Sequence, residues 1–168
     1  YLVEYLRKEN ATVYIADINP ETLNRVAQKY GAHIIDKDEF YDFDMDIYAP
    51  CALGATINDD TLSRLKCSII AGAANNQLKV ESVHGLEIMK KGIIYAPDYA
   101  INAGGVINCF SEVKGLPAEW AQQKAAEIYT TILNIVKRSQ EEHIPTYQIA
   151  NKIAEERIKA KRIVELPL

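Results

Sequence analysis

The sequence is poor in cysteine and tryptophan, and it has no long apolar run. It contains three cysteines and one tryptophan. Cys51, Cys67 and Cys109 are widely spaced and odd in number, which does not match a metal-ligand set and is typical of a reduced intracellular protein. No apolar run approaches the roughly 18 residues of a membrane-spanning helix, and the N-terminal residues resemble an amphipathic helix rather than a signal peptide. We therefore expect a cytoplasmic protein with no metal site and no membrane partner.

The sequence also lacks an excess of basic residues. Lys and Arg total 19 and Asp and Glu total 23, which gives a net charge of −4. A nucleic-acid-binding surface needs a basic stripe or patch, so we expect no nucleic-acid partner. Hydrophobic residues make up 48% and charged residues 25%, an ordinary globular balance. A chain of 168 residues fits one domain, spanning 1–168.

Short apolar segments alternate with helix-forming segments through the first two thirds of the chain. Their composition predicts strands at 12–16, 32–35, 46–49, 67–71 and 93–96. Helices are predicted at 20–30, 59–65 and 80–91. The first of these helices has Asn19 as its N-cap, Pro20 as its first residue and Gly31 as its stop. This alternation is typical of an α/β fold with a mostly parallel sheet and helices on its faces.

Three helices are predicted after the last strand, at 101–113, 118–139 and 146–163. In the second of them, apolar side chains recur at helical spacing and predict a core-facing stripe: Trp120, Ala121, Ile128, Ile132, Ile135 and Val136. Pro145 separates this helix from the next. We therefore expect a core at 1–116 followed by a helical extension at 117–168.

The segment 95–109, YAPDYAINAGGVINC, places two adjacent glycines in a helix-forming context. Glycine in a helix interior costs about 0.5–1 kcal/mol relative to alanine, so Gly104 and Gly105 indicate close approach of a backbone or a ligand. The segment follows a strand, and ligands of parallel sheets bind at the carboxyl ends of the strands. Two simpler interpretations stay open: the glycines allow tight helix packing, and Asn102 bonds backbone at a turn.

Asp17 follows the strand at 12–16, where an acidic side chain can bind the ribose hydroxyls of a dinucleotide and favour NAD over NADP. Aspartate is also a common turn former in such a place. The glycine-rich loop G-x-G-x-x-G lies about 20 residues before such an acid, and the chain contains no such motif. Its place would fall before residue 1. We therefore expect a Rossmann-type sheet that lacks the first strand and the glycine-rich loop.

The expected strand order 3-2-1-4-5-6 puts that first strand between the strands at 12–16 and 46–49. Its absence would leave buried backbone groups unpaired, at a cost of about 1–3 kcal/mol each. Three arrangements avoid this cost. A separate segment supplies the strand, the sheet pairs differently, or the two flanking strands pair directly.

Five blocks of sequence resemble the C-terminal, NAD-binding part of the glutamate/leucine/phenylalanine/valine amino acid dehydrogenase family, and its leucine-acting members most of all. The blocks are ADIN at 16–19, APCALGA at 49–55, AGAANNQL at 71–78, 95–108, and AEERI at 154–158. The resemblance implies NAD-dependent oxidative deamination of a branched-chain L-amino acid to the 2-oxo acid and ammonia. Phenylalanine or valine is the alternative substrate. A non-catalytic nucleotide-binding or interaction module derived from such an enzyme is the alternative function.

The resemblance also implies roles for individual residues. Positions matched to cofactor binding are Asp17, Ile18, Cys51, Ala52, Leu53, Asn75 and Asn76. Positions matched to substrate binding are Asn76, Asn102, Val106 and Cys109. Two of these depart from the pattern of the leucine-acting members, because Asn75 stands where they usually carry aspartate and Cys109 where they usually carry valine. Cysteine and valine are close in size, so an aliphatic substrate still fits beside Cys109.

In this family the catalytic lysines and aspartate come from an N-terminal substrate domain, which the sequence does not contain. No catalytic residue is therefore assigned here. We predict no turnover and weak NAD binding by this chain alone. The resemblance also implies a homo-oligomer.

Overall fold

A computed structural model describes residues 1–164, which form two compact units, Tyr1–Asp44 and the part from Met45 onward. Each unit has its own parallel sheet. The units divide between Asp44 and Met45, whereas the sequence predicted a boundary between 116 and 117. The organisation of the chain as a single domain stays a prediction. None of the helices described in residues 1–164 combines the length and apolar character needed to cross a membrane.

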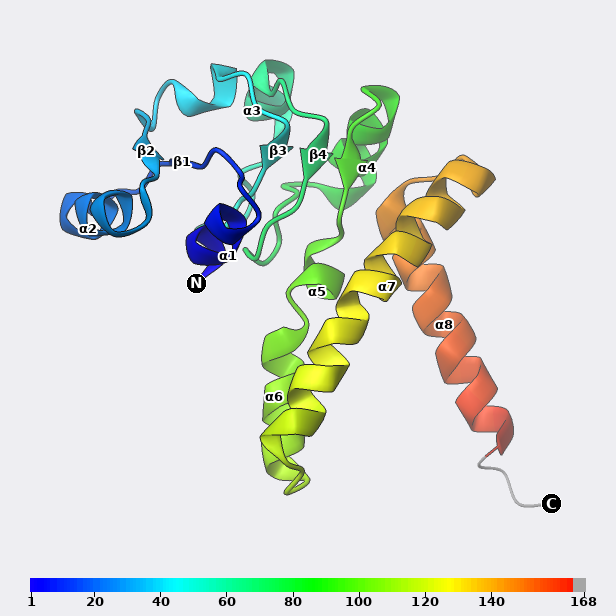
Figure 1. Cartoon of the computed structure of the whole chain (residues 1–168). Coiled ribbons are helices and arrows are strands. Elements are labelled where there is room, and N and C mark those ends of the chain that lie inside the picture. Colours follow the sequence, from blue (N-terminus) through cyan, green and yellow to red (C-terminus); the bar gives the residue numbers. More distant parts are fainter. Residues whose placement is uncertain (165–168) are drawn as a thin grey trace. The chain divides into compact units, whose positions relative to one another are not determined.

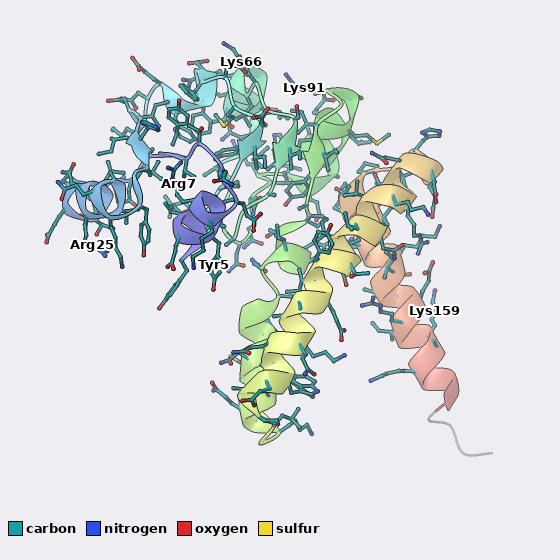
Figure 2. The ribbon with its side chains drawn as sticks, viewed as in Figure 1. Tyr5, Arg7, Arg25, Lys66, Lys91 and Lys159 are labelled. Carbon is teal, nitrogen blue, oxygen red and sulfur yellow. The ribbon has the colours of Figure 1, made fainter. Side chains whose placement is uncertain are left out.

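The first unit pairs a two-stranded sheet with two helices. Its elements are α1 (Leu2–Lys8), β1 (Tyr14–Ile15), α2 (Pro20–Tyr30), β2 (His33–Ile34) and a 3-10 turn, η1 (Phe40–Asp42). The α2 boundaries follow the sequence signals, because the Asn19 side chain accepts from the backbone N–H of Thr22 and Gly31 is left-handed. The Arg7 guanidinium, labelled in Figure 2, donates to the carbonyls of Tyr30 and Ala11 at 3.1 and 2.8 Å and joins α1 to the end of α2.

The second unit is built on a three-stranded parallel sheet. Its strands are β3 (Ile47–Tyr48), β4 (Ile69–Ile70) and β5 (Ile94–Tyr95), with Ile70 paired to both Tyr48 and Tyr95. The connecting helices are α3 (Asp59–Arg64) and α4 (Glu81–Lys90). Ile57, Ile70 and Ile88 are essentially inaccessible to solvent. Within the strands, Tyr48, Ile70 and Tyr95 are buried, which fits the apolar runs in the sequence.

Four helices follow β5: α5 (Asp98–Ile101), α6 (Gly104–Val113), α7 (Ala118–Glu142) and α8 (Thr146–Val164). Figure 1 shows α6 lying alongside α7, which turns back into α8. A core cluster of Ile135, Ile149, Ala150 and Ile153 joins α7 to α8. The predicted apolar stripe of α7 is confirmed, since its members are all buried or partly buried.

The predicted helix at 101–113 is confirmed over Gly104–Val113, but it begins three residues later than predicted, because Ile101 ends the preceding helix and the chain breaks at Asn102 and Ala103. The Asn102 side chain donates to Ala73 and Asn75, which lie in a distant loop. That tertiary bond holds the chain at the end of α5. The helical pattern could not show it, because both partners lie more than 25 positions away.

The five described strands belong to two separate sheets, β1–β2 and β3–β4–β5. Parallel pairing itself is confirmed, as is the α/β class with a helical C-terminal part.

Candidate functional site

Two loops follow the carboxyl ends of β3 and β4, at residues 49–55 and 71–78, and backbone hydrogen bonds join them. The backbone N–H of Ala74 donates to Pro50 at 2.9 Å, and that of Ala55 donates to Asn76 at 2.7 Å. Both loops carry family-matched residues, so the structure brings Cys51, Ala52 and Leu53 to the same edge of the sheet as Asn75 and Asn76. These five residues are solvent-exposed.

Glycine allows the two loops to approach this closely. A Cβ atom at Gly72 would lie 2.1 Å from the carbonyl oxygen of Pro50. One at Gly54 would lie 2.7 Å from the carbonyl oxygen of Asn75. Any larger residue would push the loops apart, so the backbone positions of the exposed residues depend on these two glycines.

Asn76 has the left-handed backbone conformation, with φ of 52°. Its carbonyl accepts from Ala55, which is itself left-handed with φ of 56°, and its N–H donates to the Asp98 carboxylate. Non-glycine residues in this region are uncommon and cluster at functional sites. The Asn76 side chain makes no hydrogen bond to the described residues, so its amide is available to a ligand.

Asn102, which lies two residues before the glycine pair, connects the end of α5 to the 71–78 loop. Its side-chain amide donates to Asn75 Oδ1 and, at 3.3 Å, to the carbonyl of Ala73. The backbone interpretation of Asn102 is therefore correct in part, while the same amide also fixes Asn75. Asn75, Asn76 and Asn102 thus form one cluster of neutral amides, which we call the amide cluster.

A buried acid lies beneath this cluster. Asp98, the first residue of α5, accepts from the Tyr95 hydroxyl at 3.1 Å and from the Asn76 backbone. Burial, with the nearby Asp98 charge, raises the pKa of Tyr95 far above its ordinary value, so the hydroxyl stays a donor. Burial and then Asp98 also raise the pKa of Glu81. Sequence reasoning missed Asp98, because its partner lies 22 positions away.

Asp17 and Ile18 belong to the first unit, where they line a shallow cleft of about 390 Å³ with Pro20, Leu23 and residues 34–37. One carboxylate oxygen of Asp17 accepts from the Asn19 backbone at 2.8 Å, so the residue does form a turn. Its second oxygen has no partner among the described residues. Ile18 is 91% exposed, an unusual position for an isoleucine that packs only against its own chain.

Val106 and Cys109 lie on α6, one turn apart, and both are exposed. Cys109 is therefore not a core residue of this chain. A Cβ at Gly104 or Gly105 would meet nothing within 4 Å. Tight packing within this chain thus does not explain the glycine pair, and the surface around it is open to a partner or ligand.

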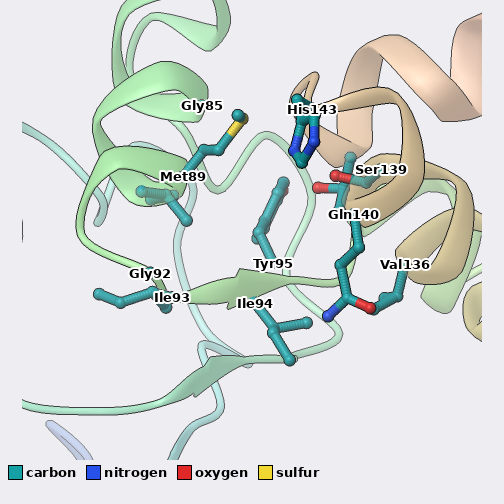
Figure 3. A pocket seen from close by; sticks show the side chains of 12 residues that line it. Gly85, Met89, Gly92, Ile93, Ile94, Tyr95, Val136, Ser139, Gln140 and His143 are labelled. Carbon is teal, nitrogen blue, oxygen red and sulfur yellow. The ribbon is translucent and has the colours of Figure 1, made fainter.

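A second cavity, of about 240 Å³, lies among α4, β5 and the junction of α7 with α8 (Figure 3). Gly92 and Ile93, which precede β5, line it together with Met89 and His143. Both residues of β5, Ile94 and Tyr95, line it as well. No local pattern in the sequence predicts this cavity, because its walls come from segments far apart in the chain.

The amide cluster offers neutral donors and acceptors at the carboxyl edge of a parallel sheet, the edge at which open α/β sheets bind ligands. No group of three or more metal-ligating side chains occurs among residues 1–164.

Comparison with known proteins identifies the family. The model of glutamate/leucine/phenylalanine/valine dehydrogenases matches residues 5–165. The leucine dehydrogenase of Bacillus subtilis is 51% identical over 161 residues, which cover 96% of this chain and 44% of that protein. The crystal structure of L-tryptophan dehydrogenase from Nostoc punctiforme is similar with a TM-score of 0.93 and 40% identity, over 96% of this chain and 49% of that one. This chain belongs to the glutamate/leucine/phenylalanine/valine dehydrogenase family, and it spans less than half the length of these relatives.

Proposed function

We propose that this chain is the NAD-binding part of a dehydrogenase that deaminates a branched-chain L-amino acid, of the leucine type, to the 2-oxo acid and ammonia. The amide cluster carries this proposal. It lies at the ligand-binding edge of a parallel sheet, and its exposed Asn76 amide can both donate to and accept from a polar ligand. The 51% identity to a leucine dehydrogenase supports the substrate class.

The residues present fit a dinucleotide. Asp17 has a free carboxylate oxygen for a ribose hydroxyl, and the exposed Ile18 provides an apolar surface for a flat ring. Cys51, Ala52 and Leu53 would contact the cofactor beside Asn75 and Asn76. When bound, NAD would accept the hydride. Asn102, Val106 and Cys109 would contact the substrate, and the catalytic groups would come from the remainder of the enzyme.

Cofactor choice gives the sharpest test. Titration of the full-length protein with NADH and NADPH, followed by cofactor fluorescence, should show NADH bound at least about tenfold more tightly, because Asp17 repels a 2′-phosphate. Asp17→Ser should remove most of that preference. Asp36→Ser, at the rim of the same cleft, is the matched control and should retain it. Equal affinity for both cofactors in the unsubstituted protein would contradict the proposal.

An aromatic substrate is the second candidate. The relative with a TM-score of 0.93 is an L-tryptophan dehydrogenase, so an aromatic specificity fits the same fold. Comparing kcat/KM for L-leucine, L-valine, L-phenylalanine and L-tryptophan in the full-length protein separates the two. We expect the highest value for L-leucine. We further propose that the enzyme is a cytoplasmic homo-oligomer, which light scattering of the purified protein tests, and that this chain alone has no turnover.

A further inference from the structure

Asp98 is the only acidic side chain that is buried among the described residues, with 9% of its surface exposed. It makes no ion pair with a basic residue in that part of the chain. Its two carboxylate oxygens are instead divided between the Tyr95 hydroxyl and the Asn76 backbone N–H. Burying a carboxyl group without a cationic partner is costly unless hydrogen bonds satisfy it, and these two bonds satisfy both oxygens.

The bond from Asn76 to Asp98 fixes the direction of the exposed amide. Asn76 is left-handed, and Asp98 holds its N–H while Ala55 holds its carbonyl. With both peptide groups fixed, the Asn76 Cα–Cβ bond has one direction. Nothing else in the described residues holds the Asn76 side chain. The direction in which this side chain leaves the backbone therefore depends on the carboxylate behind it.

We propose that Asp98 is a positioning residue that acts through Asn76, by holding it in the left-handed conformation that turns its side-chain amide toward the bound cofactor. Tyr95 supports this arrangement, because its hydroxyl donates to the second Asp98 oxygen and keeps the carboxylate oriented. This inference rests on the proposed function, since it takes NADH as the ligand. It assigns Asp98 no contact with the ligand itself.

A double-substitution cycle in the full-length protein tests it, with the NADH dissociation constant as the readout. Asp98→Asn removes the charge and weakens the bond to the Asn76 N–H, and should raise the dissociation constant about tenfold. Asn76→Ala removes the amide. Because Asp98 acts through that amide, adding Asp98→Asn to Asn76→Ala should change the constant less than about twofold. Glu81→Gln is the matched control, because it removes a neighbouring acidic charge without touching Asn76.

The alternatives give different results. A merely structural role for Asp98 predicts an equal loss in both backgrounds, and such additivity would overturn the inference. An unchanged constant in Asp98→Asn would also overturn it, provided that the backbone amide resonance of Asn76 has shifted and so reports the weakened bond. If the unsubstituted protein does not bind NADH, the proposed function fails and this inference with it. If the unsubstituted protein binds NADH but the effects of Asp98→Asn and Asn76→Ala are additive, only the role of Asp98 is rejected.

Discussion

Gly72 packs against Pro50 so closely that a Cβ atom would lie 2.1 Å from the Pro50 carbonyl oxygen and 2.5 Å from its nitrogen. Both obstacles are backbone atoms, so no side-chain rotation relieves the clash. The contact joins the loop after β3 to the loop after β4. The exposed residues of both loops, including Asn75 and Asn76, therefore depend for their positions on a glycine that carries no functional group.

Substitution Gly72→Ala should destabilise the protein by roughly 2–4 kcal/mol, because one loop must move to admit the methyl group. Urea unfolding followed by circular dichroism measures the change. Gly105→Ala is the matched control, since a Cβ there meets nothing within 4 Å. A loss below about 0.5 kcal/mol for Gly72→Ala, within the range of neutral surface substitutions, would show that the loops are not held by this contact.

Gly105→Ala also makes a prediction of its own. Gly105 lies in the first turn of α6 with open space around it. Alanine should therefore stabilise the protein by about 0.4–1 kcal/mol, because it lowers the conformational entropy of the unfolded chain. If the glycine is kept for ligand approach, the same substitution should weaken NADH binding. Thermal unfolding and an NADH titration of one variant test both effects. Greater stability with unchanged binding would remove the functional explanation of the glycine pair.

Local signals in the sequence predicted local structure well. Asn19, Pro20 and Gly31 each act on the backbone within a few positions, and they predicted the limits of α2 correctly. The start of the helix predicted at 101–113 was placed three residues too early, because Asn102 is held by Ala73 and Asn75 and no local pattern shows such a partner.

The candidate site shows the same division. Its exposed loops were predicted from the family resemblance, residue by residue. The groups that hold those loops in place were not: the Gly72–Pro50 contact and the Asp98–Asn76 bond both join segments more than 20 positions apart. Asp98 gives no local sign of this role, because an aspartate in the first turn of a helix has a sufficient local explanation.

The side chain of Asn75 should accept replacement by aspartate. Asn75 Oδ1 accepts from the Asn102 amide, and a carboxylate oxygen accepts as well or better. Asn75→Asp should therefore leave the free energy of unfolding unchanged or slightly raised. Asn75→Leu has no acceptor and should lose about 1 kcal/mol. Equal stability of the two variants in urea unfolding would mean that the Asn102 bond contributes nothing.

The pairing of α7 with α8 should weaken in acid. The Arg138 guanidinium donates to both Glu156 oxygens at 2.9 and 3.1 Å and to Glu142 at 3.2 Å, while Lys152 lies 2.6 Å from Glu142. Lys152 first, and then Arg138, lowers the pKa of Glu142 below its ordinary 4.5. The bond from Arg138 lowers the pKa of Glu156 in the same way.

A carboxyl group whose pKa is lowered by folding contributes stability that is fully present above its unfolded pKa and is lost as the pH falls through its folded pKa. The contribution of Arg138 should therefore be present at neutral pH and decline below the ordinary value of 4.5. Arg138→Met should lower the thermal midpoint at pH 7 and leave it nearly equal to that of the unsubstituted protein at about pH 3.

The difference between Arg138→Met and the unsubstituted protein should also shrink in about 1 M salt, because these charges are exposed and screened. Lys137→Met, which removes a looser 3.9 Å pair with Glu141 on the same helix, is the control and should show little change at either pH. An Arg138→Met effect that is the same at both pH values would assign the stabilisation to packing of the arginine side chain instead of to its charge.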